Sequence, residues 1–286
     1  MPRLGCTPSD TREAARFGSA ASRGGIGAWT ARLDYADGMP VPSPPTRRPT
    51  VAMLVIGDEI LTGKVTDANS PWVASRCREL GLSLCRIIVL PDVLDEIAAA
   101  VAEWSRRVDF VLTSGGVGPT HDDLTMAGIA RGLGRQVERH GELDRVLQER
   151  MGKRYTPAAG RMADVPAGAT LWWDGELAFP QVVVDNIIVF PGVPALLRLK
   201  FDAIAHRFGG TPTQTRRLVT TAAESEIADA LRTVQAEHPA VAIGSYPQYD
   251  RRPWTVTITL DGYDTELLDA CERAVSALVG DRFPHA

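Results

Sequence analysis

The chain has 286 residues, of which 44% are hydrophobic and 23% are charged, a composition that is ordinary for a globular protein of one large or two smaller domains. The formal net charge of -4 argues against a general nucleic-acid-binding surface, and no apolar run reaches the ~20 residues needed to cross a bilayer, so we expect neither a nucleic-acid nor a membrane partner. The four cysteines form no CxxC pair, and we expect reduced thiols in a cytoplasmic protein.

The first segment of the chain, residues 1–48, is dominated by Gly, Ser, Pro, Arg and Ala. Such a segment buries too little apolar surface to offset its ordering entropy, so we predict a disordered N-terminal extension. Its acidic residues argue against a transit peptide. A simpler hypothesis is that natural translation starts at Met39, so that residues 1–38 are absent from the native protein; mass spectrometry of the native N-terminus would test this.

The next segment, residues 49–210, alternates short apolar runs with amphipathic stretches. The apolar runs predict buried strands at 51–56, 82–90, 108–112 and 186–190, with a hairpin formed by 171–173 and 179–184. The amphipathic stretches predict helices at 70–80, 92–106, 123–133, 140–154 and 194–208. This alternation indicates a mostly parallel sheet with right-handed crossovers.

The last segment, residues 211–286, follows a linker at 211–213 and predicts a small α+β module. The expected order is a strand at 216–221, a helix at 224–236, strands at 241–246 and 254–260, and a helix at 264–279. The turn at 247–253 carries two arginines that could contact nucleic acid, but no Gly-x-x-Gly clamp accompanies them. We see no chemistry in this module.

A glycine-rich turn follows the strand at 108–112 and organises the candidate site. Gly115, Gly116 and Gly118 can take positive φ and let another molecule approach the backbone closely. The turn is not a P-loop, because it has no lysine. It is not a dinucleotide fingerprint either, because His121 occupies the place of the third glycine.

Two carboxylates, Asp122 and Asp123, stand where the following helix begins. The amides of a helix N-terminus attract phosphate, whereas adjacent carboxylates repel it. A divalent cation between carboxylate and phosphate removes the conflict, so this turn predicts a metal-assisted phosphate-ester or pyrophosphate site. The alternative is purely structural: Asp123, at capping-box spacing from Thr120, only caps the helix, and the glycines only make a turn.

A second acidic turn, Gly57-Asp58-Glu59, follows the strand at 51–56. Both turns leave the carboxyl ends of predicted parallel strands, where ligands of open α/β sheets bind, so we expect them to face one crevice. The third joint, residues 191–194, carries no charge and could offer backbone amides to the same crevice.

Three stretches, GDEILTG at 57–63, GGVGPTHDDLT at 115–125 and FPGVP at 190–194, together resemble a known family. They are similar to the molybdopterin-binding-like (MoCF) domain of competence/damage-inducible protein A (CinA), and still more to the equivalent domain of eukaryotic FAD synthases. His121 carries this distinction, since the competence-protein loop usually has Pro there. The resemblance covers about residues 50–208, and the trailing module is similar to the KH-like region of the competence protein.

This resemblance implies a three-layer α/β/α fold and a metal-dependent nucleotide pyrophosphate hydrolase that acts on ADP-ribose or FAD, with Mg²⁺ or Co²⁺ and often K⁺. It also implies self-association as a dimer or trimer. By position it assigns metal binding to Asp58, Glu59, Asp67 and Asp122, and catalysis to Asp58, Asp122 and Asp123. It assigns ligand and phosphate binding to Gly57, Asn69, Gly115, Gly116, Gly118, Thr120 and Gly192.

One departure from the family pattern bears on these expectations. The usual Asp-Thr-Asn is Asp67-Ala68-Asn69 here, which removes a hydroxyl near the site. The competence protein's deamidase domain and the FAD synthase's nucleotidyltransferase domain are not in this sequence, so we expect neither activity. Two other functions remain open: a molybdopterin-binding or adenylylating protein with a pterin ligand, and a non-enzymatic regulatory module that retains the fold.

Overall fold

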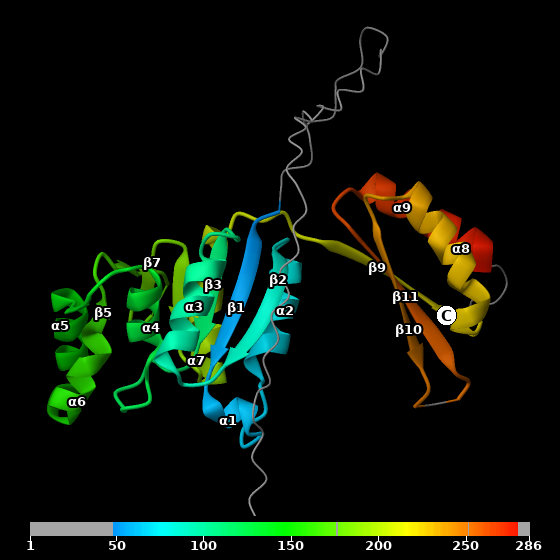
Figure 1. Cartoon of the computed structure of the whole chain (residues 1–286). Helices are drawn as coiled ribbons and strands as arrows, with labels where there is room; N and C mark the ends of the chain where they lie inside the picture. Colours follow the sequence, from blue (N-terminus) through cyan, green and yellow to red (C-terminus); the bar gives the residue numbers. More distant parts are fainter. Residues whose placement is uncertain (1–47, 176, 251, 280–286) are drawn as a thin grey trace, which may run out of the picture. The chain divides into compact units, whose positions relative to one another are not determined.

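A computed structural model describes residues 48–175, 177–250 and 252–279 (Figure 1). The predicted N-terminal extension, apart from Arg48, and the predicted start at Met39 lie outside the described residues.

A six-stranded sheet forms the centre of the larger module, in the order β2-β1-β3-β8-β7-β6. The strands are β1 (Thr50–Ile56), β2 (Ser83–Leu90), β3 (Phe110–Ser114), β6 (Thr170–Trp172), β7 (Gln181–Val184) and β8 (Ile187–Phe190). The strands β2, β1, β3 and β8 run parallel, and β7 and β6 continue the sheet antiparallel. The predicted mostly parallel sheet is therefore confirmed, and the predicted hairpin is the β6–β7 pair.

Helices cover both faces of this sheet, so the predicted three-layer α/β/α architecture is confirmed (Figure 1). The helices are α1 (Asp58–Leu61), α2 (Asn69–Glu79), α3 (Leu94–Trp104), α4 (Thr125–Gly132), α5 (Gly141–Met151), α6 (Pro157–Gly160) and α7 (Pro194–Ile204). One face packs against α3, α4 and α5, and the other against α2 and α7. No helix in the described ranges combines the length and apolarity needed to span a bilayer.

Strand β1 shows why the apolar runs are continuous rather than alternating. Leu54 packs into the core on the α3 side, whereas Met53 and Val55 pack into the core on the α2 side. Successive side chains of a strand point to opposite faces, and both faces are covered here, so every position must be apolar.

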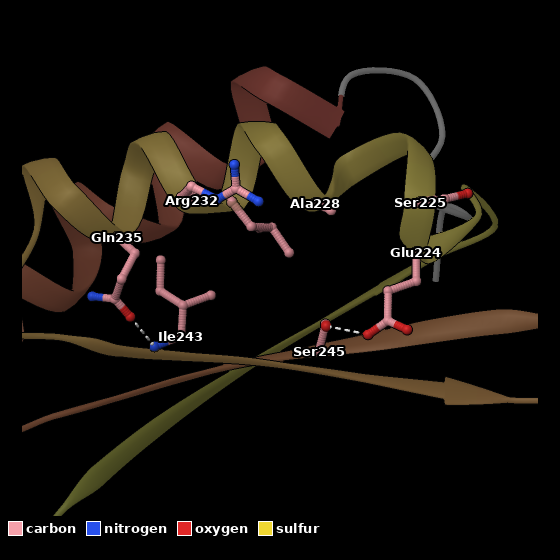
Figure 2. A pocket seen from close by; sticks show the side chains of 8 residues that line it. Glu224, Ser225, Ala228, Arg232, Gln235, Ile243 and Ser245 are labelled. Atoms are coloured by element: carbon pink, nitrogen blue, oxygen red, sulfur yellow. Dashed lines mark hydrogen bonds between the residues drawn. The ribbon is translucent and has the colours of Figure 1, made fainter.

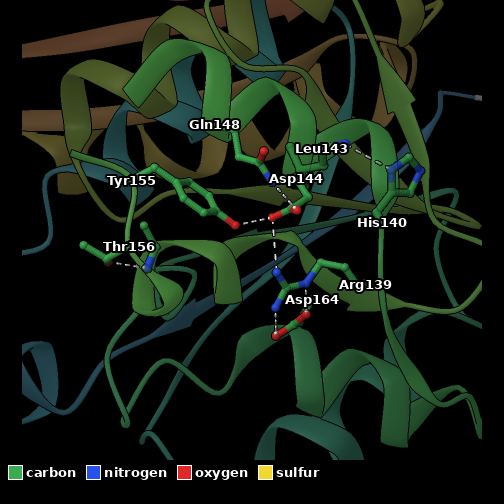
Figure 3. Close-up of polar contacts among 9 residues, drawn as sticks. Arg139, His140, Leu143, Asp144, Gln148, Tyr155, Thr156 and Asp164 are labelled. Atoms are coloured by element: carbon green, nitrogen blue, oxygen red, sulfur yellow. Dashed lines mark hydrogen bonds and ion pairs between the residues drawn. The ribbon is translucent and has the colours of Figure 1, made fainter. Parts of the chain in front are cut away.

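A two-stranded sheet of β4 (Val137–Arg139) and β5 (Asp164–Pro166) lies beside α5 and α6 and was not predicted. Arg139 joins its two strands through Asp164, at 2.5 Å from Nε, and it also reaches Asp144 at 3.1 Å (Figure 3). The Tyr155 hydroxyl and the Gln148 amide donate to the same Asp144 carboxylate, at 2.6 and 2.8 Å. The residues of β4 are all exposed, so no apolar pattern marks this strand.

The C-terminal module has the predicted order and a core of its own (Figure 1). Its elements are β9 (Gln214–Thr220), α8 (Glu224–Glu237), β10 (Ala242–Gln248), β11 (Thr255–Gly262) and α9 (Thr265–Val279). The antiparallel sheet has the order β10-β11-β9, and α8 and α9 cover one of its faces. Alternate residues of β11 are buried, as a sheet with one solvated face requires.

A hollow of about 570 Å³ lies between α8 and the edge strand β10 (Figure 2). Gln235 accepts a hydrogen bond from the outward amide of Ile243 at 2.9 Å, and Glu224 accepts one from the Ser245 hydroxyl. Pro247 has no amide to offer. The Gln235 bond and Pro247 remove two backbone donors from the outer edge of β10, which disfavours its pairing with another strand.

Candidate functional site

The parallel strands end at one edge of the sheet, and the loops that follow them meet there. The amide of Gly57, after β1, donates to the carbonyl of Leu90 in β2 at 3.1 Å, and the amide of Gly115, after β3, donates to the carbonyl of Phe190 in β8 at 3.3 Å. The two turns that we expected to face one crevice therefore leave adjacent strands at the same edge.

The glycine loop, residues 115–120, crosses closely over the end of β1. Gly115 and Gly116 have φ values of 101° and 61°, and a Cβ at Gly115 would stand 2.2 Å from the carbonyl oxygen of Ile56. The Thr125 hydroxyl donates to the Gly115 carbonyl at 2.7 Å, and the Thr125 amide donates to the Gly116 carbonyl at 3.0 Å. These bonds place the start of α4 at Thr125, two residues later than we predicted.

The carboxylate of Asp123 is occupied by its own loop. It accepts the amide of Gly118 at 2.7 Å, the amide of Thr120 at 2.8 Å, and the Thr120 hydroxyl. Asp123 precedes α4 and holds the glycine loop in shape, a role that neither the catalytic nor the helix-capping interpretation described. A metal or water would have to compete with three donors for it.

Asp58 and Asp92 are bonded to each other's backbone. The Asp58 amide donates to the Asp92 carboxylate at 2.9 Å, and the Asp92 amide donates to the Asp58 carboxylate at 3.4 Å. Burial raises the pKa of the Asp92 carboxyl, whereas the hydrogen bond from the Asp58 amide lowers it. The negative charges of Asp58, Glu59 and Asp122 raise this pKa further. We had interpreted Asp92 or Asp95 as the start of a helix, and α3 begins between them, at Leu94, without a side-chain cap. Asp92 follows the carboxyl end of β2, and this position in the sequence could have marked it as a residue of the site.

Asp122 is exposed, and hydrogen bonding from the Thr120 side chain lowers the pKa of its carboxyl, so it remains charged at neutral pH. His121 is exposed beside it, with Nδ1 3.9 Å from a carboxylate oxygen of Asp122. We call Asp58, Glu59, Asp92 and Asp122 the acidic edge, because the charges of the other three all act on Asp92. Within the described ranges, no three His, Cys, Asp or Glu side chains converge closely enough to hold a metal by themselves.

A hollow of about 90 Å³ adjoins the glycine loop, and Glu59, Asp67, Asn69, Gly115 and Gly192 are among the residues that line it. Asp67 accepts the amides of Asn69 and Ser70 at 2.9 and 3.0 Å, so Asp67, rather than Asn69 or Ser70 as we predicted, caps the start of α2. Ala68 is exposed between them.

Asn69 presents an unused acceptor. Its amide nitrogen donates to the Ser114 hydroxyl at 3.0 Å and to the Gly192 carbonyl at 2.7 Å, which fixes the orientation of the amide. Its oxygen, Oδ1, is buried and has no partner. The third joint thus offers a carbonyl to Asn69; that it could also offer amides to the crevice stays a prediction.

A second hollow, of about 160 Å³, borders the same loop and is lined by Gly116, Gly118, Thr120 and Asp123 together with Arg161. Arg161 follows α6 and donates to the Pro119 carbonyl from Nε at 3.2 Å and from Nη2 at 2.5 Å. No local motif marks this arginine, and we did not predict it as a site residue from the sequence. The predicted ligand- and phosphate-binding residues other than Gly57 are therefore divided between two hollows that share the glycine loop, and Gly57 lines neither of them.

Comparison with known proteins assigns both modules. Residues 52–210 match the family described as "Probable molybdopterin binding domain", and residues 212–283 match that described as "FAD synthase, middle domain". The chain is 32% identical over 232 residues to a protein of Archaeoglobus fulgidus, with 80% of this chain and 98% of that one covered.

Two further proteins are similar to parts of the chain. A probable FAD synthase of Caenorhabditis briggsae is 31% identical over 266 residues, and the match covers 82% of this chain but only 50% of that longer protein. The crystal structure of CinA, a protein of unknown function from Thermoplasma acidophilum, superposes with a TM-score of 0.52 at 26% identity, and the match covers 56% of this chain and 98% of that one.

Proposed function

The chain belongs to the family described as probable molybdopterin binding domains, and we propose that it is a metal-dependent hydrolase of nucleotide diphosphates such as ADP-ribose or FAD. The observation that carries the proposal is the acidic edge beside the glycine loop. The negative charges of carboxylates that follow β1 and the glycine loop raise the pKa of Asp92, which follows β2, and a cation bound there would relieve this repulsion.

The residues of the acidic edge fit a divalent ion that is shared with a ligand. Carboxylate oxygens are the donors that Mg²⁺ prefers, and Mg²⁺ is held by one or two carboxylates, waters and substrate phosphates rather than by an all-protein cage. Asp58 and Asp122 are our choice of ligands, because both carboxylates are exposed and neither is enclosed by several donors as Asp123 is.

A divalent ion bound there would neutralise the diphosphate and lower the pKa of a water molecule. The loop's glycines let a phosphate approach their backbone, and Asp123 keeps that loop in place. We assign Asp92 as the proton acceptor, because it follows the carboxyl end of β2 and its carboxylate accepts the amide of Asp58 at 2.9 Å, beside a proposed metal ligand.

The test is hydrolysis of ADP-ribose and FAD with Mg²⁺ and Co²⁺, with and without K⁺. We expect turnover by the wild type and a loss of about 10²-fold or more in kcat for Asp92→Asn, the usual contribution of a general base. Asp122→Ala should raise the metal concentration required. Asp95→Asn is the control, because this exposed acid pairs with Arg131. Equal activity in all variants, or no activity with any metal, would overturn the proposal.

The unpaired Asn69 oxygen favours a second candidate, a pterin-binding or adenylylating protein. A buried acceptor without a partner calls for a donor such as the amino group of a pterin or an adenine. Pterin fluorescence that co-purifies with the chain would support it. Tight binding of a diphosphate without any product would instead support a regulatory module.

Two further expectations remain proposals. We propose self-association as a dimer or trimer, which light scattering on the purified chain would test. We also propose a cytoplasmic location, which fractionation of cells that express the chain would test.

A further inference from the structure

Arg161 lies beside the glycine loop, where it has no role in the proposed hydrolysis. It shares the hollow of about 160 Å³ with Gly116, Gly118 and Thr120. Its side chain is exposed, so its charge is available to a bound molecule.

The segment that follows Arg161 is anchored at two residues. The neighbouring Ala163 is fully buried, and its carbonyl accepts the amide of His140 at 2.8 Å. Asp164 is held by Arg139, which is itself tied to Asp144 in the network of Figure 3. The guanidinium therefore extends from a fixed backbone toward the loop, and little ordering entropy is left to lose when it binds.

The guanidinium has donors to spare and no counter-ion within the described part of the chain. Two of its N–H groups point to one neutral carbonyl, that of Pro119, out of the five that an arginine offers. Among the residues that the structure describes, the ion pairs engage Arg131, Arg135 and Arg139, but none involves Arg161. The carboxylates nearby are already used, Asp164 by Arg139 and Asp123 by the loop.

We propose that Arg161 binds a phosphate oxygen of the diphosphate that the glycine loop holds. The loop is bordered by four acids that repel an anion, and a guanidinium supplies a permanent positive charge with donors in the planar geometry that suits phosphate. The inference rests on the proposed function, because it assigns one more residue to the same diphosphate site.

A structural role for Arg161 predicts something different. If the guanidinium only braces the loop through the Pro119 carbonyl, then a neutral donor should serve. Arg161→Gln keeps a donor and loses the charge, whereas Arg161→Lys keeps the charge and loses the forked donation. The two variants therefore separate the two roles.

The experiment is equilibrium binding of ADP and of adenosine to the full chain by titration calorimetry, with and without Mg²⁺. We expect Arg161→Gln to weaken ADP binding by about 10- to 100-fold, as the loss of a charge-assisted hydrogen bond does, and to leave adenosine binding unchanged. Arg161→Lys should recover most of the ADP affinity. Arg150→Gln, an exposed arginine on α5, is the control and should bind both as the wild type does.

Binding of ADP by Arg161→Gln at wild-type strength would overturn the inference, as would equal losses of ADP affinity in the Gln and Lys variants. The failure of the proposed function is distinguishable, because binding needs no turnover. A chain that hydrolyses no diphosphate but shows the Gln and Lys pattern with ADP would refute the hydrolase and retain the role of Arg161.

Discussion

Gly115 makes the closest approach of the glycine loop to the sheet, and its substitution tests the geometry of the whole site. Gly115→Ala would force an alanine to φ 101° and place its Cβ 2.2 Å from the Ile56 carbonyl oxygen. Strained backbone of this kind costs about 1–3 kcal/mol, and the forced backbone shift costs a further ~1–3 kcal/mol. We therefore expect a loss of roughly 2–6 kcal/mol in the free energy of unfolding.

Gly134→Ala is the matched control. Gly134 also has positive φ, at 67°, but nothing lies within 4 Å of an added Cβ, so only the strain of about 1–2 kcal/mol should appear. The difference between the two variants isolates the contact between the loop and β1.

The assay is urea unfolding of both variants beside the wild type, followed by ADP binding to whichever remains folded. The Gly115→Ala variant should also lose ADP affinity. The Gly115 carbonyl is bonded to the Thr125 hydroxyl, so a shift of residue 115 also displaces the start of α4 beside the glycine loop. Substitutions at unconstrained surface positions usually change the free energy of unfolding by less than about 0.5 kcal/mol. If the losses of the two variants differ by no more than that, then the loop does not pack against β1 as described.

Three further outcomes are expected from urea unfolding. Thr125→Val should lower the free energy of unfolding by about 1–3 kcal/mol, because the buried Gly115 carbonyl loses its hydrogen-bond donor. Thr125→Ser keeps the hydroxyl and should stay near the wild type. Equal losses in the two variants would contradict the hydrogen bond. Asp67→Ala should lower the free energy of unfolding by about 1 kcal/mol, because the cap of α2 is lost, and Asp67→Asn should keep most of that stability. An alanine variant as stable as the wild type would refute the cap. Burial lowers the pKa of Lys200 from 10.5 to about 8, and its ammonium donates to the carbonyls of Phe179 and Pro180. Between these pH values the unfolded chain binds the proton that the folded chain has released, so the free energy of unfolding of the wild type should rise with pH by roughly 3 kcal/mol relative to Lys200→Met. A difference that does not change with pH would refute the burial.

The order of strands and helices in both modules was predictable because it depends on local patterns. β1, β3 and β8 are covered on both faces and read as continuous apolar runs, and β11 alternates because one of its faces is solvated. The exposed strand β4 has no such pattern, since it is held by its pairing with β5 and by Arg139 rather than by burial. It was missed for that reason.

The sequence by itself determined which loops carry the chemistry, because glycines and carboxylates directly after apolar strands mark the carboxyl edge of a parallel sheet. Only the tertiary structure decided what each side chain does there. Asp92 reaches Asp58 across 34 residues, Arg161 reaches Pro119 across 42, and Asn69 reaches Gly192 across 123. Partners so distant in the chain leave no periodic trace, because such contacts depend on which strands lie side by side and not on the spacing of residues along any one of them.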